Sequence, residues 1–242
     1  MTQSRDPIIL RTMSLPPLSR RERIHAETVR EIRDIALRQV DEGGLAALSL
    51  NAIAKELGMS GPALYRYFAS RDELLGALHT DIYVQLVTAV REAVEASTGR
   101  SPSAHLAAYA SAYRGWALKH PRRYALLFGG RAEDFKDPAE AIAEIHEGML
   151  LLLRLLADIA GDRPVTRPPD ALDRQLTAWS KRRAGNVSFP PHILRLGVLF
   201  WTRLHGIVSL ELSSVFKDMG LDGSALLDDE VKRIVEAAGG GR

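Results

Sequence analysis

The sequence contains no cysteine and few aromatic residues. None of its 242 residues is cysteine, and only 6% are Phe, Trp or Tyr. The absence of cysteine excludes disulfide bridges, thiolate metal sites and cysteine nucleophiles, and it is compatible with a reducing cytoplasm. Hydrophobic residues make up 46% of the chain, which is enough to bury a sizeable core.

Long apolar runs are also missing. The N-terminal residues carry charges and prolines rather than the apolar stretch of a secretory signal. The longest candidate, LGVLFW at 196–201, is flanked by Arg195 and Arg203 and falls short of the roughly 20 residues that cross a bilayer. We therefore expect a cytoplasmic protein with no part in a membrane.

The chain lacks a strong charge of one sign. Its formal net charge is +2, so composition alone does not predict a nucleic-acid-binding protein. Basic residues do outnumber acidic ones in 1–71 and in 160–203. Solvated faces explain such an excess as well as a binding surface does, so the motifs have to decide.

Alternating strand patterns are absent, whereas apolar residues recur every three or four positions, which predicts helices. We expect an all-α protein. The proline-containing residues 1–20 are expected to form a flexible N-terminal arm. Helices are predicted over 21–42, 50–57, 60–68, 71–96, 102–119, 121–129, 137–160, 170–183, 190–218 and, more weakly, 224–238.

The two short helices predicted over 50–57 and 60–68 are joined by a short break that contains Gly58. Two short helices joined in this way cross steeply as a helix-turn-helix, and the second can enter a major groove about 12 Å wide. Leu64 and Phe68 are four residues apart and would face the neighbouring helices. Residues 21–70 are therefore predicted to form a helix-turn-helix DNA-binding domain.

The outer surface of this motif carries groups suited to DNA. Small residues at the start of the second helix let the backbone approach base edges, and free N–H groups there attract phosphate. Phenol and guanidinium groups are suitable phosphate ligands. The alternative is an ordinary corner of a helical bundle with half-buried tyrosines. The predicted DNA-binding residues are Ser49, Lys55, Ser60, Gly61, Pro62, Ala63, Tyr65, Arg66, Tyr67 and Arg71.

The stretch LSLNAIAKELGMSGPALYRYFASRDELL (48–75) resembles the DNA-binding domain of the tetracycline-repressor (TetR) family of transcriptional regulators. Tyr67 stands where a histidine is common, and Gly61-Pro62 stands where a lysine often precedes a small residue. The operator sequence therefore cannot be transferred from the family. The resemblance implies DNA contacts from Ser49, from Ser60 to Ala63, and from Tyr65, Tyr67 and Arg71.

The second half resembles one branch of the same family. YRGWALKHPRRYALLF (113–128) and LFWTRLHGIVSLEL (199–212) are similar to a C-terminal ligand-binding and dimerisation domain that is marked by Trp, His and Gly, here Trp201, His205 and Gly206. In this family the last two long helices of each subunit form a four-helix bundle between subunits. The resemblance therefore implies a homodimer through helices 170–183 and 190–218, and the two apolar faces of 190–218 agree with it. Such a dimer would present two recognition helices about 34 Å apart to a pseudo-palindromic operator.

A pocket for a small apolar or aromatic effector is expected between helices 102–119, 137–160 and 190–218. Each residue assigned to it is by itself more typical of an ordinary core, and the prediction depends on the cluster. The predicted lining is Tyr109, Tyr113, Trp116, Phe128, Met149, Leu152, Trp201 and His205.

Enzyme motifs are missing. Glu144 and His146 are two residues apart, which places them about 200° apart around a helix rather than on one metal-binding face. The sequence has no His-Glu-x-x-His, glycine-rich phosphate loop or Gly-x-Ser-x-Gly. We expect no catalytic residues, metal or cofactor.

The sequence thus predicts a homodimeric, ligand-responsive regulator, most simply a repressor, that binds a double-stranded DNA operator and a small-molecule effector. Residues 71–218 would form the ligand-binding and dimerisation domain, with 71–96 as the connecting helix and 219–242 as a C-terminal tail. The alternative is a helical-bundle enzyme or small-molecule carrier with an incidental helix-turn-helix.

Overall fold

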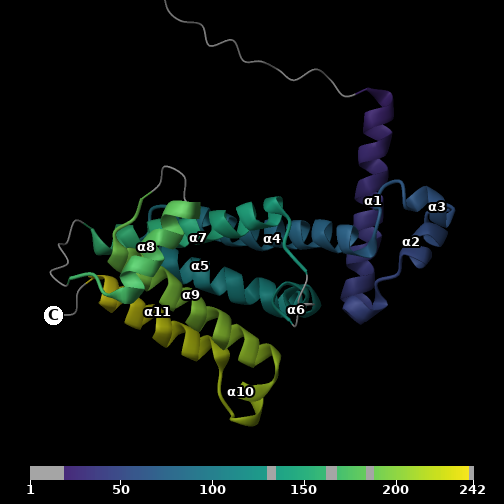
Figure 1. Cartoon of the computed structure of the whole chain (residues 1–242). Helices are drawn as coiled ribbons and strands as arrows, with labels where there is room; N and C mark the ends of the chain where they lie inside the picture. Colours follow the sequence, from purple (N-terminus) through teal and green to yellow (C-terminus); the bar gives the residue numbers. More distant parts are fainter. Residues whose placement is uncertain (1–18, 130–134, 162–167, 184–187, 240–242) are drawn as a thin grey trace, which may run out of the picture.

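The computed structural model describes residues 19–129, 135–161, 168–183 and 188–239. Every regular element within these ranges is a helix, which confirms the predicted all-α class. Figure 1 shows the long helix α4 running from a small N-terminal group of helices into a larger bundle. The elements are α1 (Arg20–Gly43), a 3-10 turn (Leu45–Ala47), α2 (Leu50–Glu56), α3 (Gly61–Leu64), α4 (Arg71–Ala96), α5 (Pro102–Lys119), α6 (Pro121–Phe128), α7 (Ala139–Ala160), α8 (Ala171–Arg183), α9 (Pro191–Leu212), α10 (Val215–Asp218) and α11 (Gly223–Gly239).

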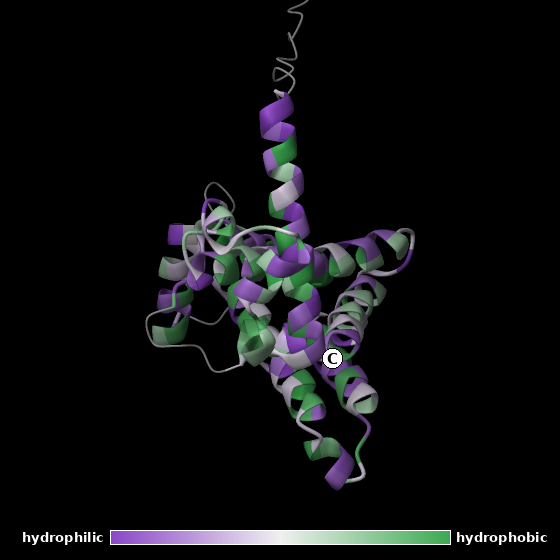
Figure 2. Ribbon diagram, turned by 90° about the vertical axis from the view of Figure 1, so that its right-hand side faces the viewer, coloured by the Kyte–Doolittle hydropathy of each residue, from purple (hydrophilic) through white to green (hydrophobic). Residues whose placement is uncertain are grey.

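Helix α1 is buried along only its C-terminal half. It begins with a capping box in which the Ser19 N–H donates to Glu22 Oε2 (2.7 Å) and the Glu22 N–H donates to Ser19 Oγ (3.3 Å). The first buried residue along the helix is Ile32, more than three turns later. Figure 2 shows the N-terminal half standing clear of the body and coloured mainly as hydrophilic. This half of α1 is therefore available to a partner.

The second helix of the predicted motif is shorter than the sequence indicated. We expected a helix over 60–68, but α3 covers Gly61–Leu64 and the next residues form a tight turn. In that turn the Tyr67 N–H donates to the Leu64 carbonyl (2.9 Å), an i→i+3 bond that tightens the helix end. The outward direction of the following side chains is set by this turn rather than by a continuing α-helix.

Helix α4 begins as the sequence predicted and forms the spine of the molecule. The Glu73 N–H donates to the Ser70 hydroxyl (3.0 Å), and the Ala69 N–H donates to Glu73 Oε2 (2.6 Å). Beyond the small group, α4 packs against α5 and α7, and α9 packs against α5, α7, α8 and α11. The centre of this bundle includes the fully buried side chains of Leu78, Ile82, Leu106, Leu152 and Phe200.

The single helix predicted over 190–218 is two helices. Helix α9 ends at Leu212, and Ser214 has φ +64°, a left-handed conformation that non-glycine residues seldom adopt. The chain then turns through α10 into α11. That last helix lies in the segment that we expected to be a tail, yet it packs against α9, α5 and α7. The apolar residues that α11 buries are Leu227, Val231, Ile234 and Ala238.

Helix α9 is the one described helix that is long and apolar enough to cross a membrane by length and composition, although we expected none from the apolar runs. Its arginines pair with neighbouring helices. Arg195 Nε lies 2.9 Å from Asp173 Oδ1, and Arg203 Nη1 lies 2.9 Å from Glu230 Oε1. These ion pairs and the packing of α9 against α5, α7, α8, α10 and α11 make it part of the helical bundle.

Candidate functional site

The α2–α3 corner presents an outer surface made of the predicted DNA-binding residues. Gly58, at φ +64°, supplies the left-handed backbone of the turn, and the Met59 N–H donates to the Ala54 carbonyl (2.8 Å). Leu64 and Phe68 are buried and hold the inner side. Lys55, Ser60, Pro62, Tyr65, Arg66 and Arg71 are exposed, and Ser49, Gly61, Ala63 and Tyr67 are half-buried.

Two of these residues also hold the corner in place. The Ser49 hydroxyl accepts from the Ala52 N–H (3.3 Å) and so caps α2. Arg71 Nη2 donates to the Leu45 carbonyl (2.8 Å), which ties the start of α4 to the 3-10 turn. A substitution at either position would disturb the corner as well as any contact made from it.

Tyr67 is oriented by a residue that the sequence did not single out. Its ring stacks on His25 of α1, with centroids 4.9 Å apart and planes 23° apart. Beside this stack lies an open cleft of about 590 Å³ between α1 and the turn after α3. The Ser-x-x-Glu pattern of Ser19 and Glu22 could have predicted this site, because it marks the start of α1 and places two arginines in its first turn. The cleft is lined by Arg20, Arg21, Ile24, His25, Arg66 and Tyr67.

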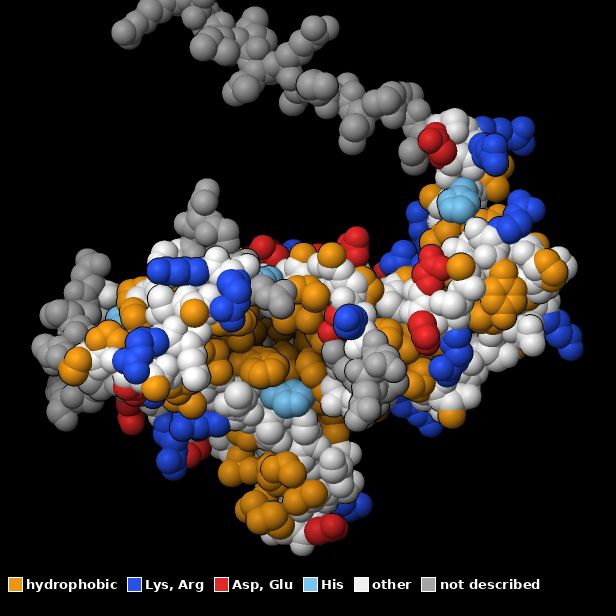
Figure 3. Space-filling view, in the orientation of Figure 1, with side chains coloured by type: hydrophobic (Ala, Val, Ile, Leu, Met, Phe, Trp, Pro, Cys, Tyr) orange, Lys and Arg blue, Asp and Glu red, His pale blue; other side chains and the backbone are white. Residues whose placement is uncertain are grey.

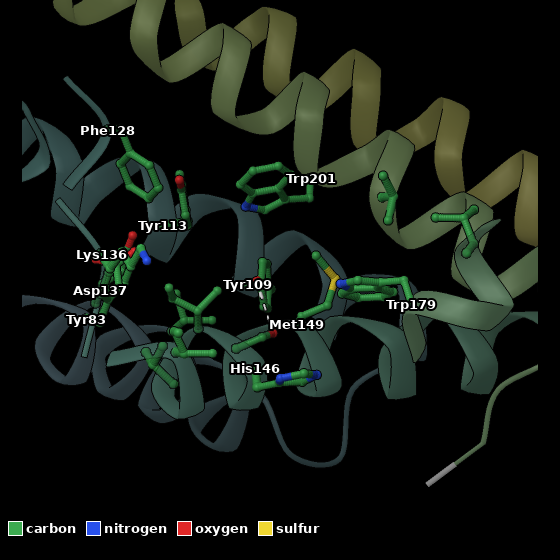
Figure 4. Close-up of a pocket in the computed structure, with 18 residues that line it drawn as sticks. Tyr83, Tyr109, Tyr113, Phe128, Lys136, Asp137, His146, Met149, Trp179 and Trp201 are labelled. Carbon is green, nitrogen blue, oxygen red and sulfur yellow. Dashed lines mark hydrogen bonds between the residues drawn. The ribbon is translucent and has the colours of Figure 1, made fainter. Parts of the chain in front are cut away.

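A second cavity, of about 820 Å³, lies inside the bundle (Figure 4). Trp201 projects from α9 and Trp179 from α8, and Figure 3 shows a hollow in this face whose walls are mainly hydrophobic. The size falls in the range of small-molecule sites, about 300–1,000 Å³. The lining is Tyr83, Leu86, Val87, Val90, Tyr109, Tyr113, Phe128, Lys136, Asp137, Ile142, Ile145, His146, Gly148, Met149, Leu176, Trp179, Val198 and Trp201.

Five of the predicted lining residues lie in this wall, namely Tyr109, Tyr113, Phe128, Met149 and Trp201. Three do not belong to it. Trp116 contacts the ring of His120 instead (5.3 Å), Leu152 is fully buried in the core, and His205 lies behind the wall among aromatic rings. The contributions of α4 and α8 were missed because their apolar stripes are also those of ordinary core helices.

Two tyrosines of the wall are kept neutral by burial. The Tyr109 hydroxyl donates to the Gly148 carbonyl (3.3 Å), and burial raises the pKa of this phenol far above its ordinary value. Burial, followed by the neighbouring Tyr124, raises the pKa of Tyr113. The pocket therefore has an apolar, aromatic interior with few polar atoms, which suits the uncharged part of a small-molecule ligand.

His205 sits at the junction of α6 and α9. Its Nδ1 lies 2.7 Å from the Tyr124 hydroxyl, and its ring stacks on Trp201 with planes 16° apart. Burial lowers the pKa of His205. A neutral imidazole whose Nδ1 accepts from the Tyr124 hydroxyl explains this arrangement.

Helix α6 connects the pocket with the small N-terminal group. Phe128 at its C-terminal end lines the pocket. At its other end Arg123 donates to Asp41 Oδ1 of α1 (2.8 Å) and to Gln85 Oε1 of α4 (2.6 Å), and Arg122 donates to the Asp41 carbonyl. One eight-residue helix thus contacts both the pocket and the C-terminal end of α1.

The described residues contain no group of three or more His, Cys, Asp or Glu side chains placed to hold a metal ion. The buried His79 of α4 instead pairs with Asp137 at the pocket wall, with Nδ1 and Oδ1 3.0 Å apart. This pair ties α4 to the segment that precedes α7.

Comparison with known proteins decides the family. Residues 32–78 match the description "Bacterial regulatory proteins, tetR family", and residues 106–234 match "Tetracyclin repressor-like, C-terminal domain". The chain belongs to the TetR family of transcriptional regulators. Membership in this family argues against the alternative of a helical-bundle enzyme or carrier with an incidental helix-turn-helix.

Individual TetR-family relatives agree over nearly the whole chain. The HTH-type transcriptional regulator Rv1816 of Mycobacterium tuberculosis is 32% identical over 221 residues, covering 89% of this chain and 92% of its own. The crystal structure of the protein SCO4313 is 37% identical with a TM-score of 0.72, covering 89% and 98%. A protein of unknown function from Rhodococcus sp. RHA1, 22% identical with a TM-score of 0.64 over 87% and 94%, shows the same fold. Assignment of the chain to the family branch with Trp, His and Gly, here Trp201, His205 and Gly206, stays a prediction.

Proposed function

We propose that this regulator binds a pseudo-palindromic operator as a cytoplasmic homodimer, represses transcription there, and is released by a small apolar or aromatic effector. The observation that carries the proposal is the placement of an exposed helix-turn-helix surface and an aromatic-walled cavity at two ends of one helix, α4. A ligand that favours one position of α4 therefore changes the position of α3. Coupling of about 1–3 kcal/mol would change operator affinity roughly 5- to 150-fold.

The exposure of the α2–α3 surface supports the DNA contacts. Tyr65 keeps 48% of its area open to solvent although it is a large aromatic residue. In this proposal Pro62 and Ala63 approach base edges, while Tyr65, Tyr67 and Lys55 contact phosphates. Ser49, Ser60, Gly61, Arg66 and Arg71 complete the set proposed to contact DNA.

A gel-shift titration with DNA from upstream of the coding region tests operator binding. We expect a retarded complex that outcompetes unrelated DNA and weakens as salt rises. Binding that is indifferent to sequence, with an affinity independent of salt, would exclude the proposed regulator function. Ala63→Ser should change the base preference while the fold stays intact.

The pocket offers an optical test of effector binding. Two of the three tryptophans, Trp179 and Trp201, line the cavity, whereas Trp116 does not. A ligand found by a thermal-shift screen of apolar and aromatic compounds should change the tryptophan emission. Trp179→Phe or Trp201→Phe should remove part of that change, and Trp116→Phe should keep it. A change that survives both pocket variants would place the ligand elsewhere.

The homodimer is proposed through α8 and α9. Both helices carry exposed apolar side chains, including Leu172, Leu199 and Leu210. Helix α11 of the same chain partly covers the second apolar face of α9. The exposed leucines therefore support the interface better than the presence of two apolar faces on α9 does. A two-fold dimer also supplies the second recognition helix that a pseudo-palindrome needs.

A further inference from the structure

The cleft between α1 and the turn after α3 has the character of an anion site. Three of its six lining residues are arginines, namely Arg20, Arg21 and Arg66, and the lining holds no carboxylate. Figure 3 shows several basic side chains gathered at this upper end of the molecule. The three guanidinium groups come from two elements that are far apart in sequence, so the fold itself brings them together.

Within the described residues, the arginines of this cleft form no ion pair with a carboxylate. Elsewhere the pattern is different: Arg33 pairs with Asp81, Arg114 with Glu211 and Arg195 with Asp173. For Arg20, Arg21 and Arg66 the described part of the chain contains no such carboxylate. The nearest acidic side chain along α1, Glu22, is engaged with the Ser19 N–H in the capping box. Like charges held together without counter-charges attract an anion from outside.

The N-terminal half of α1 extends beyond the core without burying itself. Arg20 precedes Val29, the first residue of α1 that packs against the core, by nine positions, so α1 projects about 13 Å past its packed part. The His25–Tyr67 stack joins this half of α1 to the turn after α3. That stack joins the projecting half to Tyr67, which is itself proposed to contact DNA.

We propose that this cleft binds neighbouring backbone phosphates of duplex DNA, with Arg20, Arg21 and Arg66 as the ligands and His25 as the residue that positions Tyr67. The inference rests on the proposed DNA-binding function and extends the interface from α3 onto α1. It assigns Arg66 to the backbone rather than to a base. Guanidinium groups form paired hydrogen bonds with phosphate oxygens, and these contacts are independent of sequence.

Because the contact is independent of sequence, it can be measured without the operator. Fluorescence anisotropy with a labelled random-sequence duplex of about 30 base pairs, titrated at several salt concentrations, gives the slope of log K against log salt. Each lost phosphate contact should reduce that slope by about 1. We expect reductions of about 1 for Arg66→Ala and about 1–2 for Arg20→Ala/Arg21→Ala, with weaker binding at every salt concentration.

Arg154→Ala is the matched control, since Arg154 is an exposed arginine on α7 in the bundle. It should leave both slope and affinity unchanged. If the cleft variants keep the wild-type slope, the phosphate site is overturned. Binding of duplex DNA by the wild type would then still support the proposed regulator function. Absence of duplex binding by the wild type at low salt would instead defeat the proposed function itself. The melting temperatures of all variants should match the wild type, because these side chains are exposed.

The positioning role of His25 has its own test. His25→Phe keeps a ring for the stack on Tyr67, whereas His25→Ala removes it. We expect His25→Ala to weaken duplex binding several-fold and His25→Phe to restore most of the loss. Equal loss in both variants would overturn the positioning role. Addition of inorganic phosphate at constant ionic strength should not displace the duplex; specific displacement would mean that the cleft takes a free anion instead.

Discussion

At the scale of single residues, Tyr67 contributes a ring and a hydroxyl that can be tested separately. Tyr67→Phe keeps the stack on His25 and removes only the hydroxyl. Loss of one hydrogen bond should weaken duplexes of every sequence by a similar factor, about 3- to 10-fold. Anisotropy titrations of operator and random duplexes measure this. A loss restricted to one base position would contradict the phosphate contact.

His205 gives the bundle a pH dependence. Burial lowers the pKa of His205 in the folded state below its unfolded value of about 6.5. Its contribution to stability is therefore present above that value and is lost as pH falls through the folded pKa. Between about pH 7.5 and 5.5 the melting temperature of the wild type should fall more than that of His205→Gln. Equal falls in the two proteins would show that this imidazole does not control the response.

The pocket shows which residue-level predictions a sequence supports. Tyr109 and Tyr113 are four positions apart on α5 and both reach the cavity. Trp116, three positions further on, was expected beside them but packs on His120, because a short step around the helix axis takes it off the pocket face. The sequence shows which aromatic residues share one face of a helix. Only tertiary packing decides which of them line the cavity. Trp179 was missed for the same reason, since α8 gives no signal that it covers the cavity.

At the scale of elements, helix starts were easier to predict than helix ends. Ser70 and Glu73 mark the start of α4 because side-chain oxygens satisfy free N–H groups there. The end of α9 at Ser213 and Ser214 has no glycine or proline to announce it, and a left-handed serine depends on the surrounding fold. Helix α11 appeared weak in isolation because its stability comes from packing on α9, α5 and α7.

Helix α6 provides the element-scale prediction, through the pair that joins it to α1. The side chains of Arg123 and Asp41 are 17% and 37% exposed, so their bidentate pair is partly shielded from water. In a double-mutant cycle with Arg123→Ala and Asp41→Ala, we expect a coupling of about 1 kcal/mol in the free energy of unfolding. Urea denaturation curves of the four proteins measure it.

The exposed Arg233–Asp229 pair on α11 serves as the matched control, since both side chains are more than half exposed. Its cycle should give a clearly smaller coupling, as exposed ion pairs do. If the Arg123 pair couples no more strongly than this, α6 does not hold α1 in place. A stronger coupling would show that α6, which also carries Phe128 of the pocket wall, holds α1 in place.

At the scale of the whole molecule, the proposed homodimer depends on the distance between its two recognition helices. One α2–α3 corner offers few base contacts, and a two-fold dimer places two of them about 34 Å apart on one face of DNA. The spacing is then set by the subunit interface and by α4. Any change that separates the subunits should therefore reduce operator affinity without touching a DNA-binding residue.

We expect Leu199→Glu combined with Leu210→Glu to convert the proposed dimer into a folded monomer. The charges would be buried in the proposed α8–α9 interface, whereas both side chains are exposed within one chain. Light scattering coupled to size-exclusion chromatography measures the mass. Leu118→Glu, at an equally exposed leucine on α5 outside that interface, should remain dimeric. The monomer should lose operator binding at least 10-fold while its salt-dependent binding to random duplex persists. A double variant that stays dimeric would place the interface on another face of the bundle.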